Sequence, residues 1–193
     1  MKQIIYRLII IGVILMTISL TFGCSATIEQ YKNTEPKLKL EAYLNGRIEG
    51  SGIIQDWKGK VTKRFSFLAN ASWSQGIGTL DEKMVYYDGK TDHRIWTIKR
   101  VNDHYYEATT KDLVGIAKIY VEGNAMNWQY QMNITVDQAT YKITFDDWMF
   151  LMHDGVLINK NQFSKFGFNV GSLTLMMQKK QTPSMDNGAV DEK

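Results

Sequence analysis

The stretch from Met126 to Val136 alternates without exception between apolar and uncharged polar residues. Its apolar positions are Met126, Trp128, Tyr130, Met132, Ile134 and Val136, and the positions between them are Asn, Gln and Thr. Side chains on a β-strand point to opposite faces in turn, so this pattern predicts a strand with one apolar and one polar face. Residues 61–73 and 140–145 alternate in the same way, although Lys63 and Leu68 interrupt the first of these runs. No sustained helical period competes with this signal.

The region between residues 38 and 180 contains no proline, which suits a continuous sheet because proline removes a ladder hydrogen bond. Clusters of Gly, Asn and Asp, such as Asp88-Gly89-Lys90, divide it into short segments and tolerate positive φ. We therefore expect an all-β fold, an antiparallel up-and-down β-barrel of about eight to ten strands, lipocalin/calycin-like, because closure removes the sheet edges. A two-sheet sandwich is the alternative. Charges such as Arg94 and Lys118 argue against a barrel that spans a membrane.

The first residues have the pattern of an export signal. Lys2 and Arg7 precede an uncharged run over residues 8–22, whose 15 residues are fewer than the roughly 20 that span a bilayer. This predicts a signal peptide over residues 1–23. Leu20-Thr21-Phe22-Gly23-Cys24 resembles the cleavage box of bacterial lipoproteins, with Leu20 one place earlier than usual. The resemblance implies a lipid anchor (diacylglyceryl and palmitate) on Cys24, and Ser25 implies the periplasmic face of the outer membrane.

Three further parts follow the signal peptide. We expect a lipidated tether over residues 24–37, the barrel over 38–180 and a flexible C-terminal tail over 181–193. Without Lys2 and Arg7 the chain holds 21 basic and 20 acidic residues, so it has no electrostatic reason to bind nucleic acid. One Cys and three scattered His provide no ligand set for a metal, and no motif indicates a cofactor.

Four phrases occur together along the chain: residues 78–82 (GTLDE), 123–128 (GNAMNW), 145–149 (FDDWM) and 165–167 (KFG). With Phe65 and the lipoprotein start, they resemble the proteobacterial lipoprotein family known as domain of unknown function 3833, over nearly the whole mature chain. The resemblance implies a lipocalin-like barrel and a connection with lipids. It brings no catalytic residues, because that family has no established activity. True lipocalins carry Gly-x-Trp on their first strand, and Ala71-Ser72-Trp73 lacks that glycine.

The candidate ligand site is the interior of the barrel. The residues expected to line it are Phe65, Phe67, Trp73, Trp96, Trp128, Tyr130, Met132, Tyr141 and Phe145. The same residues suit a filled core, so the interior is either a cavity or solid. Arg94 and Arg100 share the strand parity of Trp96 and are the candidates for binding a carboxylate headgroup. Asp146 and Asp147 are adjacent, so we expect them on opposite faces and in structural roles.

Three functions fit these observations. The first is a non-catalytic, envelope-anchored module that binds or presents a fatty acid or another lipid. The second is a structural or assembly lipoprotein with a filled barrel and an envelope protein as its partner. The third is a lipid-modifying enzyme that uses Arg94 with Asp146 or Asp147. The anchor and the aromatic alternation favour the first, a protein that is not an enzyme.

Overall fold

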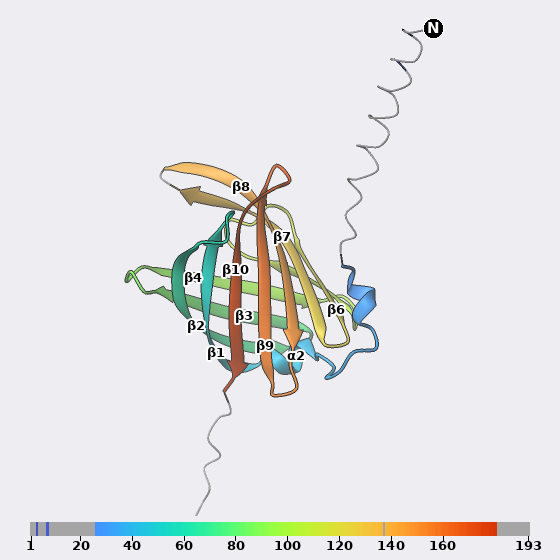
Figure 1. Ribbon diagram of the computed structural model, residues 1–193. Helices are drawn as coiled ribbons and strands as arrows, with labels where there is room; N and C mark the ends of the chain where they lie inside the picture. Colours follow the sequence, from blue (N-terminus) through green and yellow to red (C-terminus); the bar gives the residue numbers. More distant parts are fainter. Residues whose placement is uncertain (1–2, 4–6, 8–25, 137, 181–193) are drawn as a thin grey trace, which may run out of the picture.

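The computed structural model describes residues 3, 7, 26–136 and 138–180, and ten strands dominate them (Figure 1). The strands are β1 (Gly46–Asp56), β2 (Val61–Ser74), β3 (Ile77–Tyr86), β4 (Thr91–Arg100), β5 (Tyr105–Thr109), β6 (Ala117–Glu122), β7 (Ala125–Val136), β8 (Ala139–Leu151), β9 (Val156–Lys165) and β10 (Phe168–Lys179). Two short helices, η1 (Ile28–Tyr31) and α2 (Leu40–Tyr43), precede the strands. Within the described residues, no helix has the length and apolar character needed to cross a membrane.

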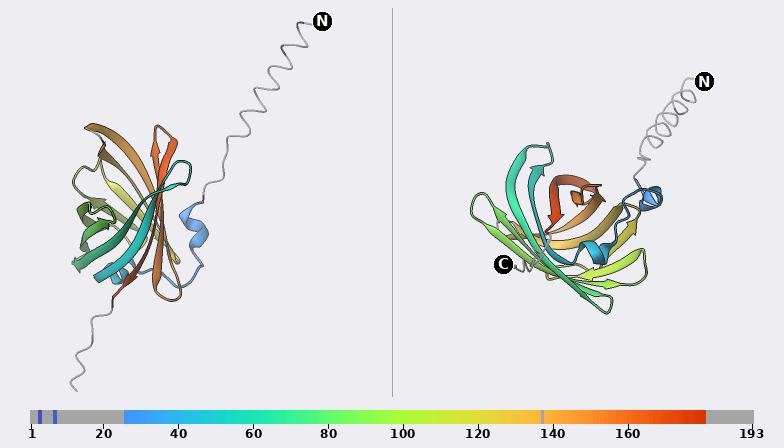
Figure 2. Two further views of the ribbon diagram at one scale, coloured as in Figure 1. Left: turned by 60° about the vertical axis from the view of Figure 1, so that its left-hand side comes forward. Right: turned by 90° about the horizontal axis from the view of Figure 1, so that it is seen from below.

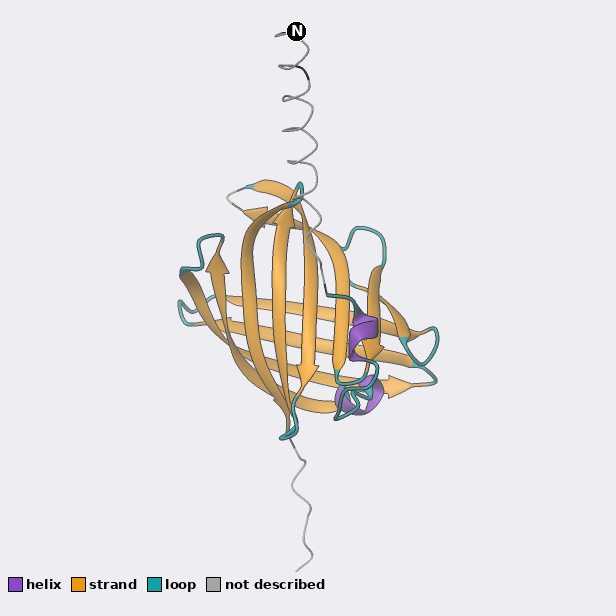
Figure 3. Cartoon of the chain, turned by 45° about the vertical axis from the view of Figure 1, so that its right-hand side comes forward, coloured by secondary structure: helices purple, strands orange, loops and turns teal. Residues whose placement is uncertain are grey.

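Each strand pairs antiparallel with the next, and β1 pairs with β10 to close the barrel (Figure 3). The predicted all-β, antiparallel up-and-down barrel is therefore confirmed. The strictly alternating run predicted from sequence is β7, which pairs with β8 from Ala125 opposite Phe150 to Val136 opposite Ala139. Trp128, Tyr130 and Ile134 on β7 point into the barrel, as the period of two requires.

One end of the barrel is closed by α2 and the residues beside it (Figure 2). Leu40 is 2% exposed, and Leu44 is buried directly after the helix. The Tyr43 hydroxyl donates to the backbone carbonyls of Gly155 and Met177, each at 3.1 Å. The Trp73 indole nitrogen donates to the carbonyl of Leu44 at 2.5 Å. These contacts bind the helix to strands on both sides, so the helix forms the floor of the barrel.

The segment before α2 lies against the outside of the barrel. The Tyr31 ring of η1 packs against Trp148 at 5.7 Å and Phe150 at 5.4 Å between centroids. Gly123 allows this approach, because a Cβ there would lie 1.8 Å from the Tyr31 carbonyl oxygen. The region predicted as a tether thus packs on β7 and β8 in its described part. The described residues do not include most of the predicted signal peptide, Cys24, Ser25 or the predicted tail.

Candidate ligand-binding site

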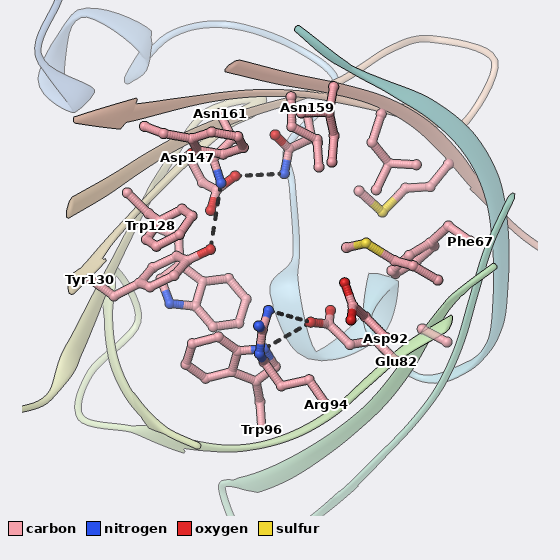
Figure 4. Close-up of a pocket in the computed structure, with 18 of the residues that line it drawn as sticks. Phe67, Glu82, Asp92, Arg94, Trp96, Trp128, Tyr130, Asp147, Asn159 and Asn161 are labelled. Carbon is pink, nitrogen blue, oxygen red and sulfur yellow. Dashed lines mark hydrogen bonds and ion pairs between the residues drawn. The ribbon is translucent and has the colours of Figure 1, made fainter. Parts of the chain in front are cut away.

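A cavity of about 420 Å³ occupies the barrel interior, and Figure 4 shows part of its lining. It extends from Leu44 at the floor toward the end opposite α2. The far end is marked by lining residues near the hairpin turns, including Lys63, Tyr86, Val136 and Val170. Small side chains help to keep the space free, because Ala69 of β2 faces inward and is fully buried. The volume lies within the range of about 300–1,000 Å³ typical of small-molecule sites. The interior is therefore a cavity with a floor and an open end.

An aromatic cluster forms one wall of the cavity. The Trp96 ring of β4 lies 4.8 Å from Trp128 and 5.3 Å from Tyr130, both on β7. Tyr130 stacks on Phe145 of β8, with centroids 4.8 Å apart and planes 8° from parallel. Phe67 lies on the opposite side (Figure 4). Rings that pack against one another in these geometries hold their positions, so the wall offers a rigid apolar surface.

Glu82 and Arg94 form a charged pair on neighbouring strands β3 and β4. Arg94 Nη1 lies 3.5 Å from Glu82 Oε1, and Trp96 Nε1 donates to the same oxygen at 3.2 Å. The side chains are only 14% exposed for Glu82 and 30% for Arg94. Burial raises the pKa of Glu82, and the nearby Arg94 opposes that rise. Arg94 is thus already engaged by a carboxylate of the protein.

A second polar group lies across β7, β8 and β9. Asn159 Nδ2 donates to Asp147 Oδ1 at 2.9 Å, and Asn161 Nδ2 donates to the Tyr130 hydroxyl at 3.5 Å. Asp147 is 4% exposed, and burial raises its pKa to about 7, although hydrogen bonds from Asn159 and Tyr130 oppose the rise. Burial also raises the pKa of the Tyr130 phenol. A substantial fraction of Asp147 is therefore protonated at neutral pH, when the carboxyl group is also a hydrogen-bond donor.

Three buried polar atoms of this wall have no hydrogen-bond partner among the described residues. They are Trp128 Nε1, Asn159 Oδ1 and Asn161 Oδ1, one donor and two acceptors. All three residues line the cavity. A buried polar atom without a partner costs about 1–3 kcal/mol, so these atoms favour a bound molecule or an ordered water that satisfies them.

Different side chains mark the open end. Lys63 Nζ lies 4.6 Å from the centre of the Tyr86 ring, and the Tyr86 hydroxyl donates to Asp92 at 2.6 Å. His93, which also lines the cavity, lies 2.7 Å from Asp81 Oδ1 through Nε2. The entrance therefore carries groups of both signs, with Lys63 free of any carboxylate within salt-bridge distance among the described residues.

The predicted lining residues divide into two groups. The cavity wall includes Phe67, Trp96, Trp128, Tyr130, Phe145 and Arg94. It does not include Phe65, Trp73, Met132, Tyr141 or Arg100. The Arg100 guanidinium group lies near the closed end instead, beside Asp103 and 3.4 Å from Glu41.

Packing explains the other displaced residues. The Phe65 ring covers Gly52, where a Cβ would lie 2.4 Å from the ring, and the Trp73 ring covers Gly78 in the same way at 2.7 Å. Met132 is buried where Leu113 forms an isolated bridge with it. Tyr141 lies near the start of β8 and is exposed. Because Gly52 and Gly78 have no side chain, the Phe65 and Trp73 rings lie flat over them along the wall and do not extend into the cavity.

Sequence reasoning did not identify Glu82, Asn159 or Asn161 as cavity residues, and it considered Asp147 for a functional role only in the enzyme hypothesis. A signal was present, because Glu82 has the parity of Leu80 and Met84. Polar residues at apolar positions of a strand are candidates for a functional interior. The prediction that adjacent aspartates face opposite ways does hold, since Asp146 accepts from Asn127 while Asp147 accepts from Asn159. Within the described residues, no group of three or more His, Cys, Asp or Glu is placed to hold a metal.

Comparison with known families gives a match over residues 18–179 to a family described as a protein of unknown function, DUF3833. The chain belongs to the DUF3833 family. The family resemblance inferred from the short phrases is thereby confirmed. None of the curated proteins matches this sequence.

Two solved structures have a fold similar to that of this DUF3833 barrel. One is the S-type phycobiliprotein lyase CPES from Guillardia theta, with a TM-score of 0.57 and 3% identity, covering 82% of this chain and 99% of that one. The other is Rv2717c from M. tuberculosis, with a TM-score of 0.52 and 11% identity, covering 77% of this chain and 100% of that one. At such low identity the likeness concerns the fold alone.

Proposed function

We propose that this protein is a non-catalytic binding module that holds a fatty acid or another lipid in its barrel. The observation that carries the proposal is the cavity of about 420 Å³ walled by Trp96, Trp128, Tyr130 and Phe145. An apolar cavity with a few convergent polar groups is the usual form of a small-molecule site. The filled-barrel alternative has less support, because a purely structural core would place apolar side chains where Asp147 and the two asparagines lie.

The polar groups indicate how such a lipid is oriented. The deep part of the cavity contains two acids, Glu82 and Asp147, against one base, Arg94, which is already paired with Glu82. A ligand carboxylate placed there would find no free cation to bind it, whereas a hydroxyl or amide would satisfy the atoms of Trp128 and Asn161 that have no partner among the described residues. We therefore place an uncharged polar group deep in the cavity. A fatty-acid carboxylate would instead lie at the mouth beside Lys63.

The membrane location remains part of the proposal. Lipidation of Cys24 would anchor the barrel on the periplasmic side of the outer membrane, near its source of ligand. Radiolabelled palmitate tests this directly, with Cys24→Ala as the variant. We expect the wild-type protein to incorporate label and the variant to lose it and to leave the membrane fraction. Equal labelling of the two would refute the anchor.

The ligand is tested by titrating delipidated protein with two fluorescent probes of equal chain length, one a fatty acid and one a fatty alcohol. We expect saturable binding of both, tighter for the alcohol. Ala69→Phe should block binding by filling the cavity, while Asn70→Phe, one residue along β2 on the exposed outer face, should bind normally. Absence of saturable binding to folded protein would overturn the proposal.

A lipid-modifying enzyme is the second candidate, and the raised pKa of Asp147 supports it. A carboxyl group with a pKa of about 7 in a cavity can donate or accept a proton at neutral pH. Mass spectrometry of a lipid recovered after long incubation separates the two functions. An unchanged lipid supports the binding module, and a product that Asp147→Asn fails to form supports the enzyme.

A further inference from the structure

The exposed aromatic side chains of the described residues all lie at the open end of the barrel. They are Trp57, Tyr87, Tyr141, Phe166 and Phe168. Their exposure is large, at 65% for Trp57 and Tyr87, 77% for Phe168 and 87% for Phe166. Aromatic rings of this size are normally buried, so their concentration at one end indicates a contact surface.

Four hairpins present these side chains. Trp57 lies in the β1–β2 turn, Tyr87 in the β3–β4 turn and Tyr141 beside the β7–β8 turn, while Phe166 and Phe168 flank the β9–β10 turn. The β7–β8 and β9–β10 hairpins stand at the end opposite α2 (Figure 1). Phe166 adopts φ of 52°, a conformation that bulky residues rarely take. We call these five residues the aromatic rim.

Basic side chains accompany the aromatic rim. Lys58 Nζ lies 4.8 Å from the centre of the Trp57 ring, and the Arg64 guanidinium carbon lies 5.1 Å from that of Tyr87. Lys165, at the end of β9, reaches the β7–β8 hairpin, since its Nζ lies 3.8 Å from the centre of the Tyr141 ring. Among the described residues, none of these three cations is within salt-bridge distance of a carboxylate. They remain available to an anionic partner.

The closed end has the opposite character. Three of its basic residues are matched by acids, since Arg47 lies 2.7 Å and Lys180 3.6 Å from Glu49, and Arg100 lies 3.4 Å from Glu41. Lys179 Nζ donates to the carbonyl of Ala42 instead, and Lys99 has no carboxylate within salt-bridge distance among the described residues. Aliphatic residues such as Val101 are exposed at this end, but none of the exposed aromatic residues in the described part of the chain lies there. In the described part of the chain, the open end therefore combines exposed aromatic rings with cations that have no acidic partner, whereas most of the cations named at the closed end are paired with acids.

We propose that the aromatic rim docks on an anionic lipid bilayer, with the mouth of the cavity facing the membrane. Aromatic side chains are favoured at the membrane–water interface, and nearby Lys and Arg attract anionic headgroups. A protein partner fits less well, because lysine is depleted from protein–protein interfaces and the rim is split among separate hairpins. Docking would let a lipid pass between the bilayer and the cavity without crossing water.

Site-specific labelling of the full chain tests this orientation. Cys24→Ala removes the natural thiol, and a fluorophore is attached at Phe166→Cys on the rim or at Asp103→Cys near the closed end, where the side chain is 77% exposed. Each chain is mixed with vesicles of phosphatidylcholine and phosphatidylglycerol that contain lipids with a quenching group. Attachment through the N-terminal segment affects both labelled chains equally. The difference between the two labels therefore reports orientation.

We expect strong quenching at position 166 and little at position 103. Lys58→Gln and Lys165→Gln should each lower the ratio of docked to undocked protein about fivefold, given the contribution of one basic residue near an anionic surface. Vesicles of phosphatidylcholine alone should lower the ratio further than either variant, because they remove the attraction for Lys58, Arg64 and Lys165 together. Equal quenching of the two labels would overturn the proposal. A loss of fluorescence at position 166 that is just as large without vesicles would also overturn it, because the change would then come from self-association of the protein.

The outcome is distinguishable from that of the proposed function. The lysine variants should bind the fluorescent fatty alcohol in solution as the wild-type protein does, because neither Lys58 nor Lys165 lines the cavity. Loss of docking with intact binding supports the aromatic rim. A loss of binding in the same variants would count against a separate docking surface.

Discussion

Asp147 should make the protein less stable as the pH rises, and Asp147→Asn should remove this effect. The pKa of Asp147 rises from an ordinary 3.8 to about 7 because the side chain is buried. The folded state therefore holds a proton between pH 4 and 7 that the unfolded state releases. Under this condition the free energy of unfolding falls as pH rises, and it becomes constant above about pH 7.

The magnitude follows from the difference between the two pKa values. Each pH unit in this interval costs about 1.4 kcal/mol, so the full loss is about 4 kcal/mol and the part between pH 5 and 8 is about 3 kcal/mol. Asn has nearly the same shape as a protonated Asp and can still accept from Asn159 Nδ2. Asp147→Asn should therefore resemble the wild-type protein at pH 5 and exceed its stability by about 3 kcal/mol at pH 8.

Urea denaturation followed by tryptophan fluorescence at several pH values measures this difference. A change of 3 kcal/mol shifts the midpoint by about 1 M or more. Asn159→Leu provides a second test, because loss of the hydrogen bond from Asn159 raises the pKa of Asp147 further. The fall in stability should then extend to higher pH than in the wild-type protein. A stability difference between Asp147→Asn and wild type that is constant from pH 5 to 8 would refute the reasoning.

Three further changes test other parts of the structure. Glu82→Gln should free Arg94 for a ligand, so that the fluorescent fatty acid binds more tightly while the fatty alcohol is unaffected; equal changes for both probes would contradict the assignment of Arg94. Gly123→Ala should destabilise the protein by about 1–3 kcal/mol, since the new Cβ would lie 1.8 Å from the Tyr31 carbonyl oxygen and φ is 54°; urea midpoints measure this, and an unchanged midpoint would show that η1 contributes nothing. Leu40→Ala should cost about 2–5 kcal/mol because the side chain is 2% exposed in the floor; a loss below 1 kcal/mol in the same assay would show that α2 does not seal the barrel.

Much of the barrel could be predicted because its strands carry a local signal. The alternation from Met126 to Val136 can be recognised from the two-residue period of a strand alone, and the structure places the whole run on β7. The floor could not be predicted in this way. Helix α2 has four residues, too few to show a helical period, and its position depends on contacts with Gly155 and Met177 far along the chain. Closure by a short helix is a tertiary feature without a local pattern.

The site was only partly predictable for a similar reason. Parity identifies which side chains face inward, as it did for Trp96 and Arg94, but it does not show which of them reach open space. The Phe65 ring turns over Gly52, which lies on a different strand and pairs directly with it. The register between strands is set by the whole barrel, so the contact could not be read from either segment alone. The same limit applies to Asp147, whose partner Asn159 lies on the next strand.

The interior acids provide the strongest argument that the barrel is more than a scaffold. A folded protein gains nothing in stability from Asp147, since keeping it buried makes folding less favourable above about pH 4. Asn159 and Asn161 add buried amide oxygens that have no partner in the described part of the chain, although apolar residues at these positions would satisfy the packing without that cost. Such costs are typical of functional sites, where stability is given up for binding or chemistry. If the Asp147→Asn variant is more stable than the wild-type protein but binds lipid less tightly, then Asp147 lowers the stability of the fold and contributes to lipid binding.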